Sequence, residues 1–228
     1  VIDSLLNYLI PIVDPSGNEY KIQRICGNYW FRENLKVTSF NDGTSITRIP
    51  SDASALWAQY GIDGSAAYME YEDGSTGDTY GYLYNWWCVD PSSGKNIAPE
   101  GWHVATLEEY ESMQSCVSID TSTLDDRLAP YFREFGYEHW PELLPIANQQ
   151  LSTDKYLFTA LPGGYIGTDG IGRLIGFSGN FWTSTFEGAP FNQPRLMQIS
   201  GQGPPNFELS YGQPAQGYSI RCVKDSSI

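Results

Sequence analysis

Basic residues are scarce in this sequence, and their scarcity argues against one class of partner. Lys and Arg number 13 against 27 Asp and Glu, which gives a formal net charge of -14 at pH 7. A negative field of this size repels phosphate backbones and anionic membrane surfaces. We therefore expect no nucleic-acid partner.

Long apolar runs are missing as well. No stretch approaches the roughly 18 consecutive apolar residues that a membrane-spanning helix needs. We expect no insertion of this chain into a membrane.

Histidine is nearly absent, which limits the catalytic chemistry available. His103 and His139 are too few for a zinc site of the usual type. No G-x-S-x-G motif marks a nucleophile, and with 27 acidic residues the spacing of carboxylate pairs carries no information. We expect His103 to be packed with its nitrogens satisfied, and we expect no catalytic residue.

Cysteines are few, and their pairing is open from the residues alone. The four of them, Cys26, Cys88, Cys116 and Cys222, allow three complete pairings. This number permits disulfides without requiring them.

Aromatic residues, by contrast, are abundant. The chain has 16 Tyr, 10 Phe and 7 Trp together with 23 Gly and 14 Pro in 228 residues. Such a composition is typical of a turn-rich fold in which large rings fill the core between short elements. The length suits one elaborated domain. We assign residues 13–228 to it and residues 1–12 to an N-terminal linker or edge segment.

Local patterns predict strands in the first part of the chain. The turn signal at residues 14–18 separates two short apolar or alternating runs, 10–13 and 20–25, and predicts a β-hairpin. A further strand is expected near residues 29–32. A helix is expected over residues 54–60, with Gly61 as its stop.

Later patterns predict more helices and a closing strand. Leu83, Trp86 and Trp87 have helical spacing within residues 80–89. Thr106 and Glu109 form a capping box before a helix from residue 107 to about 116, and a second helix is expected from Ser122 toward residue 135. Residues 217–223 alternate as a terminal strand. The pattern indicates an α+β fold with an antiparallel sheet and two main helices.

Seven short strings occur in a fixed order along the chain. They are 27–35 (GNYW then ENL), 40–43 (FNDG), 80–86 (YGYLYNW), 101–106 (GWHVAT), 158–165 (FTALPGGY), 181–185 (FWTST) and 218–225 (YSIRCVKD). In order and spacing, across roughly residues 14–225, they resemble one bacterial family, the Fibrobacter succinogenes major paralogous domain.

The resemblance implies a C-type-lectin-like fold in secreted proteins or lipoproteins of the bacterial cell surface. Lectin-like folds often tie their first helix to the final strand, so the resemblance favours a disulfide between Cys88 and Cys222. Cys26 and Cys116 then pair or stay reduced. The same architecture is similar to that of formylglycine-generating enzymes, which hold copper with cysteines in the C-terminal part. Here that part has no cysteine before Cys222, so we place an oxidase third among the candidate functions.

Calcium is the one cofactor that the sequence suggests. Residues 49–94 contain seven acids and no Lys or Arg, and Asp73 and Asp78 bound a tight turn with oxygen donors. The turn lacks the closing Glu of an EF-hand, so a solvated acidic loop is the favoured interpretation. The sugar-binding calcium site of true C-type lectins uses Glu-Pro-Asn or Gln-Pro-Asp. Here Arg195 follows Gln193 and Pro194, so the family resemblance adds no such motif.

The loops near residues 186–216 are the predicted recognition surface, because a rigid scaffold can present variable groups there. We expect non-catalytic binding or adhesion to a glycan or a surface protein outside the cell. The candidate ligand-binding residues are Glu187, Asn192, Gln193, Arg195, Asn206, Glu208 and Tyr211.

A structural or assembly role in a surface appendage is the alternative. It would use the apolar start of the chain to join a neighbour. The residues concerned are Leu5, Leu6, Leu9 and Ile10.

Overall fold

A computed structural model describes residues 11–71, 76–124, 127–136, 138–140, 152–201 and 206–226. All structural statements below concern these residues. The predicted apolar start, Leu5 to Ile10, and the calcium candidate Asp73 lie outside them.

The chain opens with the expected hairpin. β1 (Ile12–Val13) pairs with β2 (Glu19–Tyr20) in antiparallel register. The buried Asp14 organises the turn: its carboxylate accepts from the backbone N–H of Ser16 at 2.8 Å and from the hydroxyl of Tyr20 at 2.9 Å. An Asx turn of this kind is the physical basis of the turn signal in the sequence.

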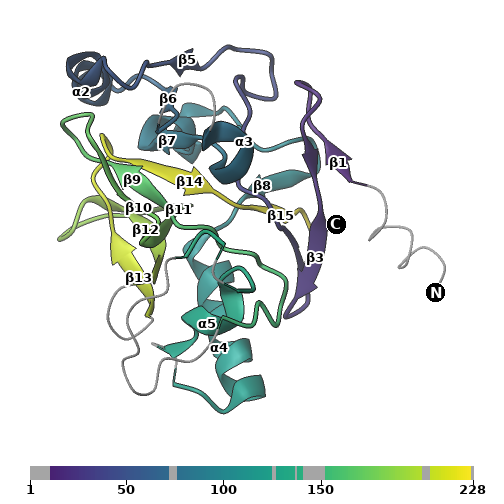
Figure 1. The fold of residues 1–228 in the computed structure, drawn as a ribbon. Coiled ribbons are helices and arrows are strands. Elements are labelled where there is room, and N and C mark those ends of the chain that lie inside the picture. The colour runs from purple at the N-terminus through teal and green to yellow at the C-terminus, as the bar shows by residue number, and fades with distance from the viewer. Residues whose placement is uncertain are drawn as a thin grey trace.

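A four-stranded antiparallel sheet joins the two ends of the described chain. Its order is β3 (Ile22–Ile25), β4 (Asn28–Phe31), β15 (Cys222–Lys224), β8 (Trp102–Val104). Val223 stands opposite Trp30, so the last strand lies directly beside an early one. Figure 1 shows the yellow C-terminal segment running through β14 and β15 across the molecule toward β3.

A larger mixed sheet carries most of the other strands. Its order is β13 (Phe207–Tyr211), β12 (Gln193–Ser200), β11 (Ser178–Glu187), β9 (Gly163–Ile166), β14 (Gly217–Ile220), β7 (Leu83–Asn85), β6 (Ala67–Met69), β5 (Thr47–Arg48), with β10 (Gly172–Ile175) paired to β9.

The purely antiparallel sheet that we predicted is therefore wrong in part, although the α+β class holds. β11 runs parallel to β9 and β14, and β5 runs parallel to β6. Parallel neighbours arise where a long connection returns the chain to the same end of a sheet. Here β14 enters beside β11 only after the chain has passed through β12 and β13.

Helices cover the two ends of this arrangement. α2 (Ser54–Asp63) lies at one end with β5 to β7, whereas α4 (Leu107–Thr121) and α5 (Ala129–Phe132) lie at the other (Figure 1). The capping box is confirmed: the Glu109 N–H donates to Thr106 Oγ1 at 3.2 Å and the Thr106 N–H donates to Glu109 Oε2 at 2.8 Å. The short helices are α3 (Thr76–Tyr80), η1 (Trp86–Cys88) and η2 (Pro91–Ser93).

Two helix predictions are wrong. Residues 80–89 form mainly β7 and the 3₁₀ turn η1, because Leu83, Tyr84 and Asn85 are all buried between β6 and β14. A fully buried strand cannot be told from a buried helix by periodicity. Ser122 does not start a helix either; it ends α4 with a left-handed φ of 53°.

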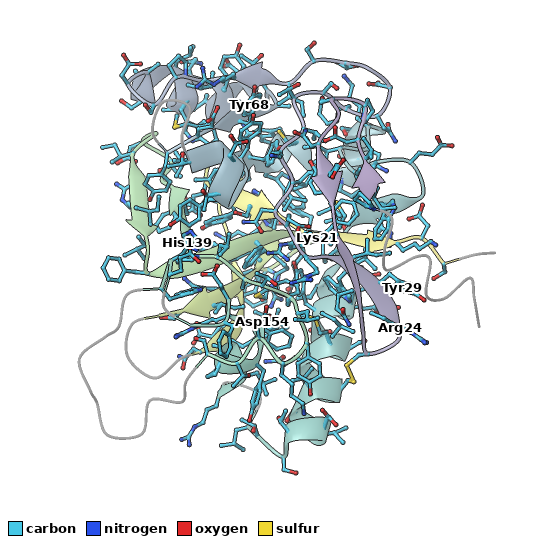
Figure 2. All side chains as sticks on the ribbon, turned by 45° about the vertical axis from the view of Figure 1, so that its right-hand side comes forward. Lys21, Arg24, Tyr29, Tyr68, His139 and Asp154 are labelled. Carbon is cyan, nitrogen blue, oxygen red and sulfur yellow. A yellow bond between two sulfur atoms is a disulfide. The ribbon has the colours of Figure 1, made fainter. Side chains whose placement is uncertain are left out.

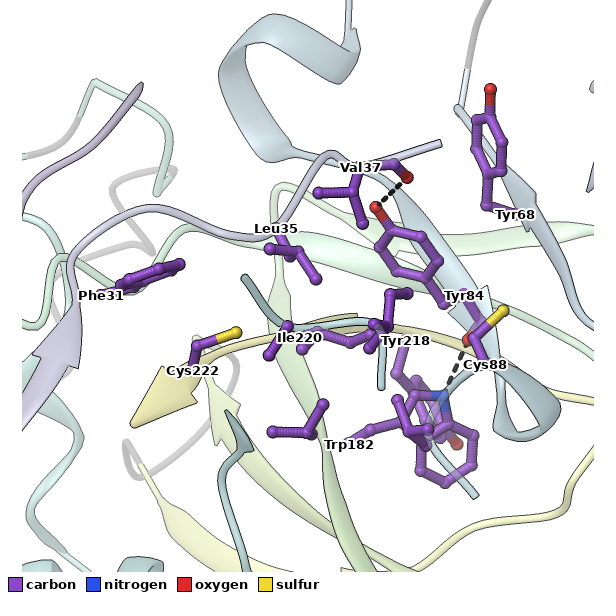
Figure 3. Packing of buried hydrophobic residues seen from close by; sticks show 14 of the residues in the cluster. Phe31, Leu35, Val37, Tyr68, Tyr84, Cys88, Trp182, Tyr218, Ile220 and Cys222 are labelled. Atoms are coloured by element: carbon purple, nitrogen blue, oxygen red, sulfur yellow. Dashed lines mark hydrogen bonds between the residues drawn. The ribbon is translucent and has the colours of Figure 1, made fainter. Parts of the chain in front are cut away.

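The predicted Cys88–Cys222 disulfide is also wrong, since Cys26 pairs with Cys116 and the other two thiols are buried and free. The register of β14 and β7 explains why. Gly217 faces Asn85 and the strands run antiparallel, so the chain leaves β7 for η1 and Cys88 at the end where β14 begins, and Cys222 lies five residues further along from Gly217. At about 3.3 Å per residue this offset exceeds the roughly 7 Å between Cα atoms that a disulfide can bridge. Figure 3 shows the two thiols at opposite sides of Ile220 and Tyr218.

Candidate recognition surface

Three strands bring the main candidate residues to one end of the larger sheet. Glu187 ends β11 and stands opposite Gln193, which opens β12. Arg195 on β12 stands opposite Tyr211, which ends β13. Antiparallel pairing therefore gathers side chains that are up to 24 positions apart in the sequence.

Glu187, Arg195 and Tyr211 form a closed polar network. The Arg195 guanidinium donates to the Glu187 carboxylate and lies 4.2 Å from the centre of the Tyr211 ring. The Tyr211 hydroxyl donates to Glu187 Oε2 at 3.1 Å, and Arg195 Nε donates to the carbonyl of Ser210 at 3.1 Å. Several simultaneous restraints of this kind fix side-chain rotamers.

Partial desolvation and the neighbouring Glu187 carboxylate raise the pKa of Tyr211 above its ordinary value. The phenol therefore stays a neutral hydrogen-bond donor over the physiological pH range.

An exposed aromatic residue that no sequence pattern predicted completes this end of the sheet. Phe191 is 50% exposed and stacks on Tyr211, with ring centroids 4.7 Å apart and planes 25° from parallel. It lies in the turn between β11 and β12, next to Asn192, which has a left-handed φ of 49°. The sequence feature that could have indicated this residue is a large aromatic side chain in a Gly-Ala-Pro-Phe turn, because turns lie on the protein surface.

A groove runs beside this network, between the start of α4 and the end of β11. It has a volume of about 560 Å³ and contains three acids but no basic side chain. The Leu107 N–H donates to Thr185 Oγ1 at 3.0 Å and fixes the two walls to each other. The lining residues are Thr106, Leu107, Glu108, Glu111, Thr185, Phe186, Glu187 and Gly188.

Two predicted residues lie elsewhere. Glu208 stands opposite Gln198 at the other end of β13, where Asn206 Nδ2 donates to its carboxylate at 3.3 Å. Asn206 and Glu208 therefore lie apart from the other five candidates. Those five lie together at the opposite end of the strands: Glu187, Asn192, Gln193, Arg195 and Tyr211.

Candidate cation ligands occur at two places. Asp78, one of the calcium candidates, is exposed and accepts from Lys36 Nζ at 3.3 Å. Calcium binding stays a prediction. Elsewhere Glu134, Glu138 and His139 have ligand atoms within 4.8 Å of one another. His139 Nδ1 lies 2.8 Å from a Glu134 oxygen. No sequence pattern predicted this group.

His103 is packed as predicted. Its Nδ1 lies 2.7 Å from Asp225 Oδ1 and its Nε2 lies 2.9 Å from Glu109 Oε1. The Glu109 hydrogen bond is the main cause that raises the pKa of His103 above 6.5, and Asp225 adds to it.

Comparison with known proteins identifies the family. The family model of the Fibrobacter succinogenes major domain matches residues 24–224. The chain belongs to this family. No curated protein and no solved structure matches significantly. Among the described residues, the Fibrobacter succinogenes major domain has no helix with the length and apolar character needed to cross a bilayer.

Proposed function

We propose that this Fibrobacter succinogenes major domain is a non-catalytic, C-type-lectin-like binding module that recognises a glycan on the outside of a bacterial cell. The observation that carries the proposal is the exposed Phe191 ring, stacked on a Tyr211 that Glu187 and Arg195 hold in place, beside an acidic groove. A surface protein is the alternative ligand.

The chemistry of this surface suits a sugar. Exposed aromatic faces pack against the apolar face of a pyranose ring, and Phe186 and Phe191 are 46% and 50% exposed. Carboxylates are strong acceptors for sugar hydroxyls, and Glu108, Glu111 and Glu187 line the groove. Because the network already fixes Tyr211, binding would cost little side-chain entropy.

The disulfide supports an extracytoplasmic location, either secreted or as a surface lipoprotein. Disulfides persist in oxidising compartments and are rare in the cytosol. The Cys26–Cys116 bond ties the turn between β3 and β4 to α4, as the yellow bond near Arg24 in Figure 2 shows.

Buried thiols support the non-catalytic assignment. Burial raises the pKa of both Cys88 and Cys222, so these thiols are protonated at neutral pH. A protonated, fully buried thiol is neither a good metal ligand nor a nucleophile. The oxidase chemistry of formylglycine-generating enzymes therefore has no accessible free thiol among the described residues, because Cys26 and Cys116 are joined to each other.

A glycan array compares wild-type protein with two single variants. Phe191→Ala should abolish binding to the recognised glycans, because it removes the stacking face. Phe135→Ala is the matched control, since Phe135 is 77% exposed and lies outside the groove and the Tyr211 network. A double variant Asn192→Ala/Gln193→Ala should weaken binding.

Running the array with calcium and with a chelator tests the calcium prediction at the same time. The proposal fails if wild-type protein binds no glycan, or if Phe191→Ala binds as wild type does.

A further inference from the structure

Three metal-ligating side chains gather just after α5, and none of them belongs to the recognition surface. Glu134, Glu138 and His139 each offer one ligand atom, and these atoms all lie within 4.8 Å of one another. Glu138 is exposed, and the side chains of Glu134 and His139 are 17% and 23% exposed. An ion in solution can therefore approach all three. Figure 2 shows His139 on the opposite side of the view from Arg24 and Tyr29.

One buried carbonyl anchors the chain at the two partly buried ligands. The backbone N–H of Glu134 donates to the carbonyl of Ala160 at 3.1 Å. The indole N–H of Trp140, which follows His139, donates to the same carbonyl at 2.9 Å. Between these anchors the chain turns at Gly136, whose φ of 85° is in the left-handed region. Both ligands therefore stand on backbone that is positioned before any ion binds.

The imidazole ring of His139 already directs its Nδ1 atom at the Glu134 carboxylate. Nδ1 lies 3.0 Å and 2.8 Å from the two carboxylate oxygens. The Tyr80 ring packs edge-on against the imidazole, with centroids 5.6 Å apart and planes 78° apart, and so restricts its rotation. Because an ionised carboxylate can only accept, Nδ1 carries the proton in the ion-free protein. A metal ion would take the place of this proton, since a histidine nitrogen must be deprotonated to bind a metal.

The spacing of the ligand atoms suits a small transition-metal ion. Zinc binds histidine nitrogen and carboxylate oxygen at about 2.0–2.2 Å, so two ligand atoms at a tetrahedral angle lie about 3.3 Å apart. The distance from His139 Nδ1 to Glu134 is already close to this value. A rotation of the exposed Glu138 side chain closes the remaining gap. Calcium, by contrast, prefers about six to eight oxygen ligands and gains nothing from an imidazole.

The other histidine of the chain also contacts two carboxylates, but its geometry does not suit a chelated ion. His103 Nδ1 faces Asp225 at 2.7 Å and its Nε2 faces Glu109 at 2.9 Å. The two ring nitrogens point away from each other, so these carboxylates lie on opposite sides of the imidazole. His103 therefore provides an internal control, because it has the same residue types without a shared centre.

We propose that Glu134, Glu138 and His139 bind one divalent transition-metal ion such as Zn²⁺. Imidazole and carboxylate are both ligands of zinc, and two carboxylates with a neutral imidazole balance its charge, so one histidine suffices here. Three protein ligands leave a coordination position for water or for a group of another molecule. The site does not depend on glycan binding, because its residues are separate from Phe191 and the Tyr211 network.

Isothermal titration with ZnCl₂ tests the site, with MgCl₂ as the comparison ion. Wild-type protein should bind one equivalent of Zn²⁺ and should bind Mg²⁺ much more weakly, because magnesium prefers oxygen ligands. His139→Gln should weaken zinc affinity by at least about tenfold, since loss of an outer-shell partner alone costs about 10–100-fold. His103→Gln is the matched control and should bind zinc as wild type does. Equal zinc affinities for the two variants, or equal affinities of wild type for the two ions, would overturn the proposal.

A surface variant tests the third ligand without disturbing the packing. Glu138→Gln should weaken zinc affinity, because it removes a charged ligand from an exposed position. Glu100→Gln, another exposed glutamate, should leave the affinity unchanged. If Glu138→Gln binds zinc as tightly as Glu100→Gln does, the three-ligand site is wrong.

Two further measurements keep the test independent of folding and of the proposed glycan surface. The chain has two histidines, so nitrogen resonances of their rings can be assigned with His103→Gln. In the wild-type protein, Zn²⁺ should shift the ring-nitrogen resonances of His139 and leave those of His103 unchanged. Phe191→Ala should retain zinc binding, because it belongs to the other site. A His139 ring that does not respond while zinc binds would place the ion elsewhere.

Discussion

Arg221 carries its charge in a fully buried position, and among the described residues it forms no ion pair with a carboxylate. It lies between β14 and β15, where the chain passes from one sheet to the other. Its guanidinium donates to Asn34 Oδ1 at 2.6 Å and to the carbonyls of Phe31 and Thr159 at 3.0 Å, and it lies 4.5 Å from the centre of the Phe158 ring. Burial lowers its pKa to about 10, so the charge persists at neutral pH.

Arg221→Met should destabilise the fold by about 3 kcal/mol, because it leaves several buried carbonyl groups without a donor. The free energy of unfolding in urea measures this loss. Arg24→Met, an exposed arginine on β3, should change it by less than about 0.5 kcal/mol. A similar loss for the two variants would mean that Arg221 does not link the sheets energetically.

The residues of the recognition surface were predictable only in part, because residue type can be read from the sequence whereas strand pairing cannot. Polar character and a predicted loop position mark Glu187 and Arg195, but both lie on paired strands, β11 and β12, and the pairing brings them together. The same criteria select Glu208, but β13 carries it to the other end of the sheet. Phe191 was not predicted, because its stacking on Tyr211 is a property of three-dimensional packing.

Element boundaries were predicted correctly where the hydrogen bonds that define them join residues close together in the sequence. The capping box at Thr106 and the Asp14 turn are satisfied within a few residues, and both are present. The helix predicted over residues 80–89 failed because burial on both faces of β7 replaces the alternation that marks a strand. The terminal strand predicted over residues 217–223 is confirmed, but it divides at Arg221 into β14 and β15, which belong to different sheets.

His103 links two elements in a pH-dependent way. It joins Asp225, just after β15, to Glu109 in the first turn of α4. Its folded-state pKa is raised, mainly by Glu109, so its stabilising contribution is present below pH 6.5 and is lost as the pH rises through the raised value. Because the imidazole is a third exposed, we expect a contribution of about 0.5 to 1 kcal/mol.

The pH dependence of unfolding measures this contribution. Wild-type protein should exceed His103→Gln in free energy of unfolding at pH 5.5, and the difference should shrink toward pH 8.5. In a Glu109→Gln background the pH-dependent part should become smaller. A difference that grows with pH would have the wrong sign for this mechanism.

The disulfide restrains two elements that are distant in sequence. Cys26 and Cys116 are 90 positions apart, and closing a loop of that length stabilises by roughly 4 to 5 kcal/mol in the chain-entropy model. Cys26→Ser/Cys116→Ser should lower the free energy of unfolding by about that amount. Thiol titration of wild-type protein should detect two thiols only after unfolding, and non-reduced peptide mapping should recover Cys26 joined to Cys116. A peptide joining Cys88 to Cys222 would contradict the structure.

At the scale of the whole molecule, two aromatic cores share the same strands. Phe181 on β11 and Met197 on β12 belong to one core. Their chain neighbours Trp182 and Leu196 point to the opposite face and belong to the other core. Trp182 donates its indole N–H to the carbonyl of Tyr84 at 2.7 Å, deep in the cluster that Figure 3 shows. Neither core can lose its packing without disturbing strands that the other requires.

We therefore expect the two cores to unfold in one transition, although the chain is long enough for intermediates to be common. Leu196→Ala opens one core and Met197→Ala opens the other; each should cost about 2 to 5 kcal/mol and lower the urea midpoint without changing the slope. Tryptophan fluorescence and far-ultraviolet circular dichroism should report the same midpoint for both variants. If Leu196→Ala separates the two signals into distinct transitions, the cores are independent and the shared strands do not couple them.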